Sequence, residues 1–174
     1  MIVLYRGARG RGKTLTMCKD ALKFYKLGYR IISNMTLSFG ENITGEEVLA
    51  LNRSSELYDC VLVIDEMQLF FDSRNFGNKG NKDFSNFIQQ IRKRNVHILF
   101  TTQYLGTVDL RIRQHIDVVC YPKFNKELSI CDCRYFDITK LEDDYDFIKP
   151  LKPVRVIYDA KPIFPLFNTN EMLK

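Results

Sequence analysis

The chain has 174 residues, of which 45% are hydrophobic, and a formal net charge of +5. This length suffices for the core of one domain, and the absence of any apolar run of about eighteen residues argues against a membrane span. Five scattered cysteines favour reduced thiols over the disulfide framework of a small secreted domain. We therefore expect one soluble, intracellular domain spanning 1–174.

The first half of the sequence predicts alternating strands and helices. Residues 2–5 (IVLY) form a continuous apolar run, which is typical of a strand buried on both faces of a parallel sheet. Apolar residues then recur at helical spacing over 13–27, and Gly28 is a natural helix stop. Residues 29–35 and 59–67 predict a second and a third strand, separated by a loop that enters a short helix within 41–52.

The second half continues this pattern and then becomes rich in β structure. Residues 70–83 read as a loop, 84–95 as a helix with Phe84, Phe87, Ile88 and Ile91 inward, and 96–103 as a fourth buried strand. Three β-rich segments follow at 116–124, 128–136 and 153–161. The sequence thus predicts an α/β domain with three layers, in which a nucleotide-binding core (1–120) precedes a β-rich extension (121–174).

Three of the cysteines, Cys120, Cys131 and Cys133, lie close together in the β-rich part. Their spacing lacks two CxxC pairs, and no histidine follows closely. Buried cysteines on strands are therefore favoured over a zinc site.

The segment GARGRGKT (7–14) matches the phosphate-binding pattern GxxxxGK[ST] and lies between a predicted strand and a predicted helix. Glycines let successive backbone N–H groups converge on phosphate oxygens, and the helix N-terminus adds partial positive charge. Lys13 is expected to reach the β and γ phosphates, and Thr14 to bind Mg²⁺. The alternative is a glycine-rich turn with a surface lysine. The residues expected to contact nucleotide are Gly7, Ala8, Arg9, Gly10, Arg11, Gly12, Lys13, Thr14 and Leu15.

The strand over 59–67 ends in two acids, Asp65 and Glu66. Ligands of open α/β sheets bind at the carboxyl ends of the strands, where Asp65 is expected to hold Mg²⁺ through a water molecule. Glu66 is expected to polarise a water for attack on the γ-phosphate, which favours hydrolysis over transfer to another substrate. The alternative is that both acids merely end a strand in solvent.

The strand over 96–103 ends in Thr101, Thr102 and Gln103. If this strand neighbours the acidic one, Gln103 is expected to bond the attacking water or the γ-phosphate and so to sense loss of the phosphate. Taken alone, the segment is only a polar strand end.

Together, GARGRGKTLTMCKDALKFYKLGYRIISNM, VLVIDEMQLFF and IRKRNVHILFTTQ resemble the FtsK/HerA superfamily of P-loop NTPases (RecA/ASCE-like), most closely its zonular occludens toxin (Zot)-like and genome-packaging branch. The later RVIYDAK resembles a YDxK-like segment of that family. The resemblance implies a mainly parallel sheet of order 5-1-4-3-2. It places the loop lysine and threonine on Lys13 and Thr14, the metal aspartate and catalytic glutamate on Asp65 and Glu66, and the glutamine on Gln103. The family's arginine finger falls on Arg92 or Arg94. Because one helix end cannot easily point both arginines into its own phosphate site, we expect donation to the neighbouring subunit, with Arg111 and Arg113 as reserve candidates; the alternative is that the basic residues pair with the C-terminal dipole of the helix.

The resemblance implies an ATP- and Mg²⁺-dependent motor that works as a homo-oligomeric ring. Zot-like phage proteins usually continue through a transmembrane helix, and this sequence ends before one, which favours packaging of double-stranded viral DNA. A viral capsid or membrane vertex is a further expected partner, and the expected location is the host cytoplasm, with association with the virion. Basic residues of the 70–83 loop, Arg74, Lys79 and Lys82, are candidates to contact DNA phosphates, or else form a solvated loop. A virion-assembly or export ATPase acting on protein, a P-loop kinase and a non-hydrolysing nucleotide-binding scaffold are the alternatives.

Overall fold

The computed structural model describes residues 1–44, 47, 57–70, 87–91, 93–108, 110–139 and 151–168, which form an eight-stranded sheet of order β3-β2-β4-β5-β1-β6-β7-β8. The strands are β1 (Ile2–Arg6), β2 (Arg30–Ser33), β3 (Glu41–Asn42), β4 (Cys60–Ile64), β5 (His97–Thr102), β6 (Val118–Asn125), β7 (Ile130–Asp137) and β8 (Val154–Asp159). Pairing is parallel from β3 to β6 and antiparallel for β7 and β8. The predicted order 5-1-4-3-2 is confirmed as β6-β1-β5-β4-β2.

The central strands β1, β4 and β5 owe their place to continuous apolar sequence. Each residue of β4 is buried, as are the first four of β1 and the last five of β5. Such strands have apolar side chains for both faces, so both faces must be covered.

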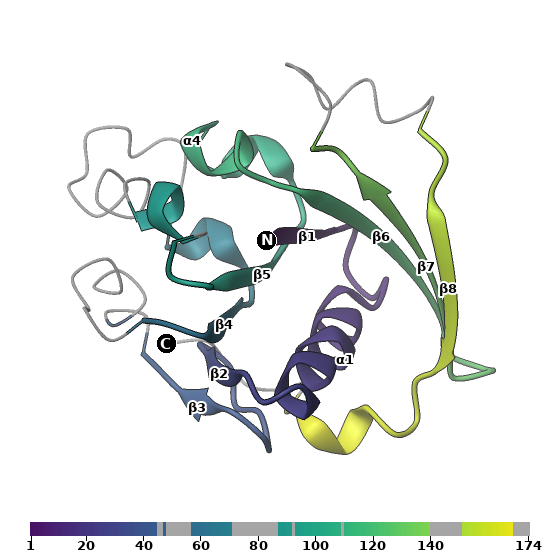
Figure 1. Cartoon of the computed structure of the whole chain (residues 1–174). Helices are drawn as coiled ribbons and strands as arrows, with labels where there is room; N and C mark the ends of the chain where they lie inside the picture. The colour runs from purple at the N-terminus through teal and green to yellow at the C-terminus, as the bar shows by residue number, and fades with distance from the viewer. Residues whose placement is uncertain are drawn as a thin grey trace.

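Helical segments cover both faces of this sheet, which confirms the three-layer prediction (Figure 1). Helix α1 (Lys13–Lys26) packs on one face and ends before Gly28, whose φ of 91° suits glycine. The other face carries η2 (Met67–Leu69), helical residues 87–90 and α4 (Leu110–Arg113), and Phe87, Ile88 and Ile91 are buried there as predicted. Short 3₁₀ turns η3 (Leu105–Thr107) and η5 (Phe164–Leu166) complete the described helical structure.

Strands β6, β7 and β8, which we call the arm, curl around α1 so that the helix lies between the central strands and β8 (Figure 1). Cys120, Cys131 and Cys133 are buried in the cluster between the arm and α1, and all five cysteines are reduced. Within the described ranges, no group of three His, Cys, Asp or Glu side chains is placed to hold a metal. The prediction of buried strand cysteines is confirmed.

The short strand β3 replaces the start of the loop predicted over 41–52. Both of its residues are exposed, so no apolar pattern marked it. Of the short helix expected within 41–52, the structure describes Glu47, which is helical and whose N–H donates to Oγ1 of Thr44 at 3.3 Å. Residues 71–83 of the expected loop and Phe84 lie outside the described residues. Among the helices that are described, none combines the length and apolar character needed to cross a bilayer.

Candidate functional site: a phosphate loop beside two acids

Residues 7–12 connect β1 to α1 in the form that the GxxxxGK[ST] pattern predicts. Gly10 and Gly12 have φ values of 73° and 86°, a region that favours glycine. A Cβ on Gly12 would lie 3.0 Å from Cβ of Phe124 and 3.3 Å from Sγ of Cys131. The glycine is thus required both by the backbone angle and by the close approach of the arm.

The loop leaves its outer residues accessible and buries its lysine. Residues 8–11 are exposed, whereas Lys13 is 7% exposed and its Nζ donates to the carbonyl of Ala8 at 3.3 Å. Burial lowers the pKa of Lys13, and the carboxylates of Glu66 and Asp65 oppose this shift. The ammonium therefore folds back across the loop toward the acids instead of extending into solvent as a surface lysine would.

Asp65 lies where β4 ends, against the first turn of α1. Oγ1 of Thr14 donates to its two carboxylate oxygens at 3.1 and 3.3 Å, and Oγ1 of Thr101 donates to Oδ1 at 2.6 Å. Burial raises the pKa of Asp65, while the hydrogen bond from Thr101 lowers it. The structure thus brings together Thr14 and Asp65, the two residues that the sequence assigned to one Mg²⁺ site.

Asn34, which the sequence reasoning missed, holds the backbone of Asp65. Its side chain accepts from the N–H of Asp65 at 2.8 Å and donates to its carbonyl at 3.0 Å. Asn34 directly follows the buried strand β2, and a polar residue at the carboxyl end of a strand beside β4 was the signal that could have identified it.

Glu66 adopts a left-handed backbone conformation, with φ 52° and ψ 54°. Its N–H donates to Oγ1 of Thr101 at 2.9 Å. Non-glycine residues rarely occupy this region, and where they do the surroundings must hold them there. The hydrogen bond from Glu66 to the neighbouring strand supplies such a constraint, so the turn after β4 is fixed to β5.

Two glutamine amides contact the Glu66 carboxylate. Nε2 of Gln103 donates to Oε1 at 3.4 Å, and Nε2 of Gln68 donates to Oε2. Gln103 thus lies beside the acids, as expected from adjacent strands β4 and β5. Gln68 was not anticipated, because its position in η2 carries no pattern that distinguishes it from a surface residue.

The two threonines before Gln103 have different surroundings. Thr101 bonds Asp65 and Glu66, whereas Oγ1 of Thr102 donates to the carbonyl of Tyr104 at 3.2 Å. Alternation of side chains along a strand explains the difference, because only one of two successive residues can face α1.

Of the candidate arginines, Arg92 lies outside the described residues, as do Arg74, Lys79 and Lys82 of the expected DNA-contacting loop. The guanidinium of Arg94 lies over the rings of Tyr58 and Phe87, with its Cζ 5.6 and 5.7 Å from the ring centres. Its Nη2 donates to Oε1 of Gln90 at 3.1 Å. Arg94 precedes β5, at the opposite end of that strand from Gln103. A strand of that length spans about 20 Å, so Arg94 does not reach the phosphate loop of the same chain.

A family described as zonular occludens toxin (Zot) matches the sequence over residues 41–169. The matched range starts after the phosphate loop and includes both acids, Gln103 and the arm. Among curated proteins, none matches the chain at a significant level.

Solved structures of similar fold cover nearly the whole chain. The N-terminal domain of zonular occludens toxin from Neisseria meningitidis has 16% identity and a TM-score of 0.70, over 96% of this chain and 98% of that one. The genome packaging NTPase B204 of Sulfolobus turreted icosahedral virus 2, in complex with ATP-gammaS, has 15% identity and a TM-score of 0.56, over 93% of each chain. The ATPase domain of G40P has 11% identity and a TM-score of 0.53, over 98% of this chain and 84% of that one. At these identities the likeness establishes the fold, which is that of a P-loop NTPase.

Proposed function

The chain belongs to the zonular occludens toxin (Zot) family, and from this premise we propose that it is a magnesium-dependent ATP hydrolase. One observation carries the proposal: three segments distant in sequence meet at the carboxyl edge of the sheet. They are the loop with Thr14, the end of β4 with Asp65 and Glu66, and the end of β5 with Gln103. A glycine-rich turn without a nucleotide would not need a buried lysine facing two carboxylates.

The loop and Lys13 form the proposed phosphate site. Backbone N–H groups at the start of α1 point out of the helix toward the loop, where they favour an anion. Lys13, buried and close to the acids, adds a full positive charge. Polyphosphate binding would replace the bond from the Lys13 ammonium to the Ala8 carbonyl with a stronger one, because the phosphate acceptor is itself charged.

The oxygen donors opposite the loop suit Mg²⁺. The hydroxyl of Thr14 and the carboxylate of Asp65 are hard ligands already in contact, and Mg²⁺ commonly binds one or two such groups together with substrate phosphates. Thr14 and Asp65 would hold the ion, which supplies positive charge beside the phosphates. Asn34 keeps Asp65 in place through its backbone.

Glu66 is the proposed general base. Its carboxylate is adjacent to Asp65, and the amides of Gln68 and Gln103 orient it. In this role Glu66 accepts a proton from the attacking water. Gln103 is proposed to exchange its bond to Glu66 for one to the water or the γ-phosphate, which would make the end of β5 sensitive to phosphate release.

An ATPase assay combined with equilibrium ATP binding tests this function. Lys13→Ala should lose both binding and turnover, whereas Glu66→Gln should keep binding and lose about 10²- to 10⁴-fold in turnover. Lys26→Ala and Glu127→Gln change the same residue types at exposed positions and should leave both quantities unchanged. Full turnover in Glu66→Gln would contradict hydrolysis through Glu66. Phosphate recovered on an acceptor would favour the kinase, and binding without turnover in the unmodified protein would favour the scaffold.

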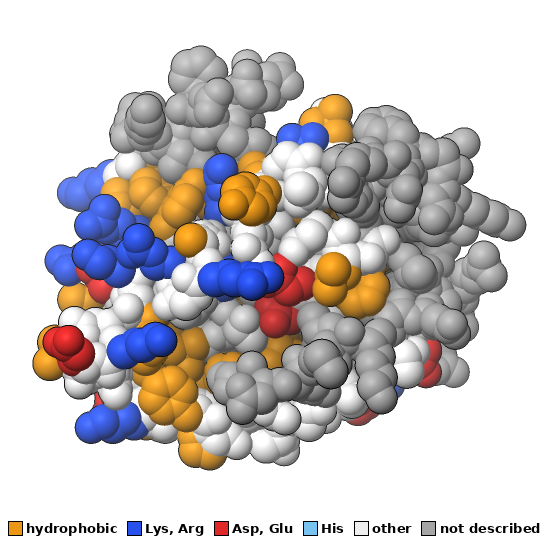
Figure 2. All heavy atoms as spheres, turned by 180° about the vertical axis from the view of Figure 1, so that it is seen from behind, with side chains coloured by type: hydrophobic (Ala, Val, Ile, Leu, Met, Phe, Trp, Pro, Cys, Tyr) orange, Lys and Arg blue, Asp and Glu red, His pale blue; other side chains and the backbone are white. Residues whose placement is uncertain are grey.

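We further propose that hydrolysis moves double-stranded DNA. The net charge of +5 supports an anionic partner, and Figure 2 shows Lys and Arg side chains gathered toward one side of the face it presents. Basic contacts to phosphates supply a grip that is independent of sequence.

The cargo is tested by measuring ATPase activity with and without double-stranded DNA over a range of salt concentrations. Stimulation that falls steeply with salt is expected. A second candidate is an ATPase that exports or assembles virion proteins. Lack of stimulation by any DNA would favour that candidate.

The active form is proposed to be a ring in which an arginine completes the neighbouring subunit's site. Since Arg94 lies at the far end of β5 from its own loop, it would act only in trans. Arg92 is the alternative candidate for the finger. Such a finger typically contributes about 10³ to 10⁵ in rate. Mixing Arg92→Ala with Lys13→Ala subunits, or Arg94→Ala with Lys13→Ala, should restore part of the activity. Mixed assemblies that show no rescue with either arginine would contradict the assignment.

A further inference from the structure

The arm is joined directly to the phosphate loop. The N–H of Phe124 on β6 donates to the carbonyl of Arg11 at 3.1 Å, and Phe124 and Cys131 occupy the space next to Gly12. The loop is therefore held from outside the core by strands that follow it by more than a hundred residues.

A chain of hydrogen bonds also links β8 to the loop. Oγ1 of Thr16 donates to the carbonyl of Gly12 at 2.8 Å, and the hydroxyl of Tyr158 lies 3.0 Å from the same Oγ1. Because the proton of Thr16 is committed to Gly12, Tyr158 is the donor in the second bond. Burial raises the pKa of Tyr158, so the phenol keeps the proton that it donates. The sulfur atoms of Cys131 and Cys133 lie 3.5 and 3.4 Å from Oγ1 and enclose it.

These hydrogen bonds fix the orientation of the peptide group between Gly12 and Lys13. In a planar trans peptide the C=O of Gly12 and the N–H of Lys13 point in opposite directions. The carbonyl of Gly12 accepts from both the N–H and the hydroxyl of Thr16, so it points into the helix. The N–H of Lys13 must then point out of the helix, toward the loop. A bond that fixes the carbonyl therefore also fixes a donor of the phosphate site.

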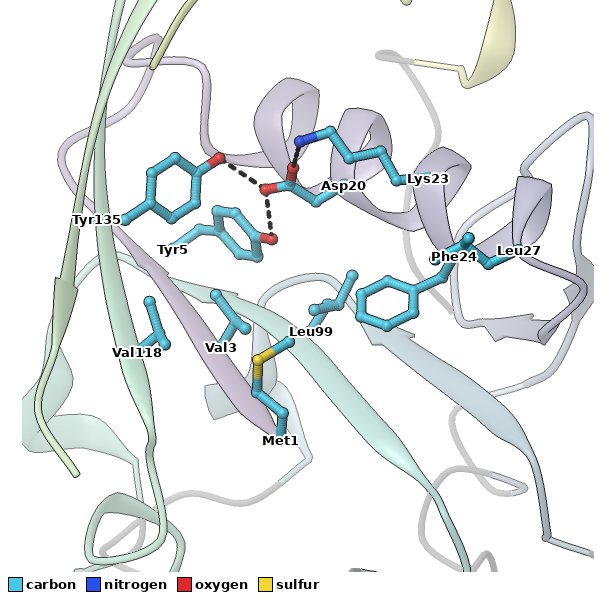
Figure 3. A pocket seen from close by; sticks show the side chains of 10 residues that line it. All are labelled: Met1, Val3, Tyr5, Asp20, Lys23, Phe24, Leu27, Leu99, Val118 and Tyr135. Carbon is cyan, nitrogen blue, oxygen red and sulfur yellow. Dashed lines mark hydrogen bonds and ion pairs between the residues drawn. The ribbon is translucent and has the colours of Figure 1, made fainter. Parts of the chain in front are cut away.

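A second group of contacts holds the arm, including Tyr158, against α1. Nζ of Lys19 lies 4.7 Å from the centre of the Tyr158 ring, donates to the hydroxyl of Tyr135 at 3.3 Å and pairs with Asp20 at 3.0 Å. Figure 3 shows the hydroxyls of Tyr135 and Tyr5 converging on Asp20, at 2.6 and 2.9 Å. These contacts lie one helical turn beyond Thr16 and touch none of the loop residues. A substitution that removes one of them, at Tyr135, therefore serves as a control for a substitution of Tyr158.

We propose that Tyr158 is a positioning residue for the nucleotide phosphates, acting through Thr16 on the peptide between Gly12 and Lys13. The inference rests on the proposed function, because it assigns a role in the same phosphate site. It also gives a physical reason for the tyrosine in the YDAK segment (158–161), which the proposed reaction does not use. The arm thereby contributes to the site although none of its side chains is proposed to touch the nucleotide.

The test is the affinity for ATP and ADP of Tyr158→Phe, measured with the unfolding temperature of each variant. Loss of one neutral hydrogen bond predicts affinity reduced about three- to tenfold. Thr16→Val should cause a similar loss of affinity. The double variant should bind ATP no more weakly than Thr16→Val alone, because both changes interrupt the same series of hydrogen bonds. Tyr135→Phe removes a hydroxyl from the same arm and should leave affinity unchanged. Unchanged affinity in Tyr158→Phe, with or without a lower unfolding temperature, would overturn the proposal. Absence of ATP binding in the unmodified protein would instead overturn the proposed function.

Discussion

The two ends of helix α1 have opposite surroundings. At its N-terminus, Lys13, Thr14 and Thr16 make hydrogen bonds with the loop, with β4 and with β8. At its C-terminus the helix covers an apolar pocket of about 350 Å³ (Figure 3). The pocket is lined by Met1, Val3, Tyr5, Asp20, Lys23, Phe24, Leu27, Leu99, Val118 and Tyr135.

This difference indicates where specific geometry is needed. Buried polar groups are costly unless each one has a partner, and the N-terminal end of α1 satisfies them one by one. The other end relies on apolar contact, which is not directional and tolerates a void. We therefore expect substitutions at the first end to change nucleotide binding and those at the second to change stability alone.

The largest effect is expected from Gly12→Ala. An alanine at φ 86° costs about 1–2 kcal/mol, and the contacts with Phe124 and Cys131 add overpacking of about 1–3 kcal/mol. Gly28, at the other end of α1, has a φ of 91°, but a Cβ there would meet nothing within 4 Å. Gly28→Ala should therefore lower the free energy of unfolding by only about 1–2 kcal/mol. Urea unfolding measures both costs. ATP binding should be lost in Gly12→Ala only, and equal behaviour of the two variants would remove the distinction between the ends.

Asp20→Ala tests whether the contacts in the middle of α1 affect nucleotide binding or stability alone. It removes the acceptor of Tyr5 and Tyr135 and leaves Lys19 buried without its carboxylate, which should lower the free energy of unfolding by about 2–3 kcal/mol. Nucleotide affinity of the folded fraction should remain within about twofold of the unmodified protein, a difference below roughly 0.4 kcal/mol. A loss of affinity as large as that of Tyr158→Phe would mean that the loop depends on the whole helix rather than on its first turn.

Gln103→Leu should affect turnover with little effect on stability. Its amide reaches Glu66 at 3.4 Å, so the substitution removes a group that orients the base while keeping a similar volume. We expect kcat to fall about tenfold at unchanged KM, since one hydrogen bond near 1.4 kcal/mol is lost in the transition state. Steady-state kinetics measure both constants. A rise in KM alone would assign Gln103 to substrate binding.

The smallest effect is expected from Val118→Leu, which adds one methylene to the wall of the apolar pocket. Burying that group should raise the free energy of unfolding by about 0.5–0.8 kcal/mol. Turnover should not change, because the pocket lies away from the loop, and thermal unfolding together with the ATPase assay measures both. A change in kcat would connect the pocket to the site.

The sequence predicted those parts of the molecule that carry a local pattern. Continuous apolar runs indicated β1, β4 and β5, and adjacency of β4 and β5 then placed Gln103 beside Glu66. Strand β3 was missed because two exposed residues have no periodicity.

The contacts missed at the site depend on tertiary geometry. Asn34 holds Asp65 because β2 and β4 end at one edge, and Tyr158 reaches Thr16 because the arm curls around α1. The curl accumulates over three strands, and neither sequence pattern nor spacing reveals its extent. Sequence reasoning thus identified the residues proposed to act on the phosphates more readily than the residues that hold them.

The position of β1 in the sheet has a consequence for folding during synthesis. Ile2 pairs with Ile98 on one side, and Val3 pairs with Val118 on the other, so both neighbours of the first strand are made long after it. Such distant pairings make folding slow, because a long loop must close before any contact offsets its entropy. Until Ile98 and the residues that follow it have been made, β1 has neither of its partners in the sheet. Strand β1 is therefore made before both of its partners and is among the last strands to acquire its pairing.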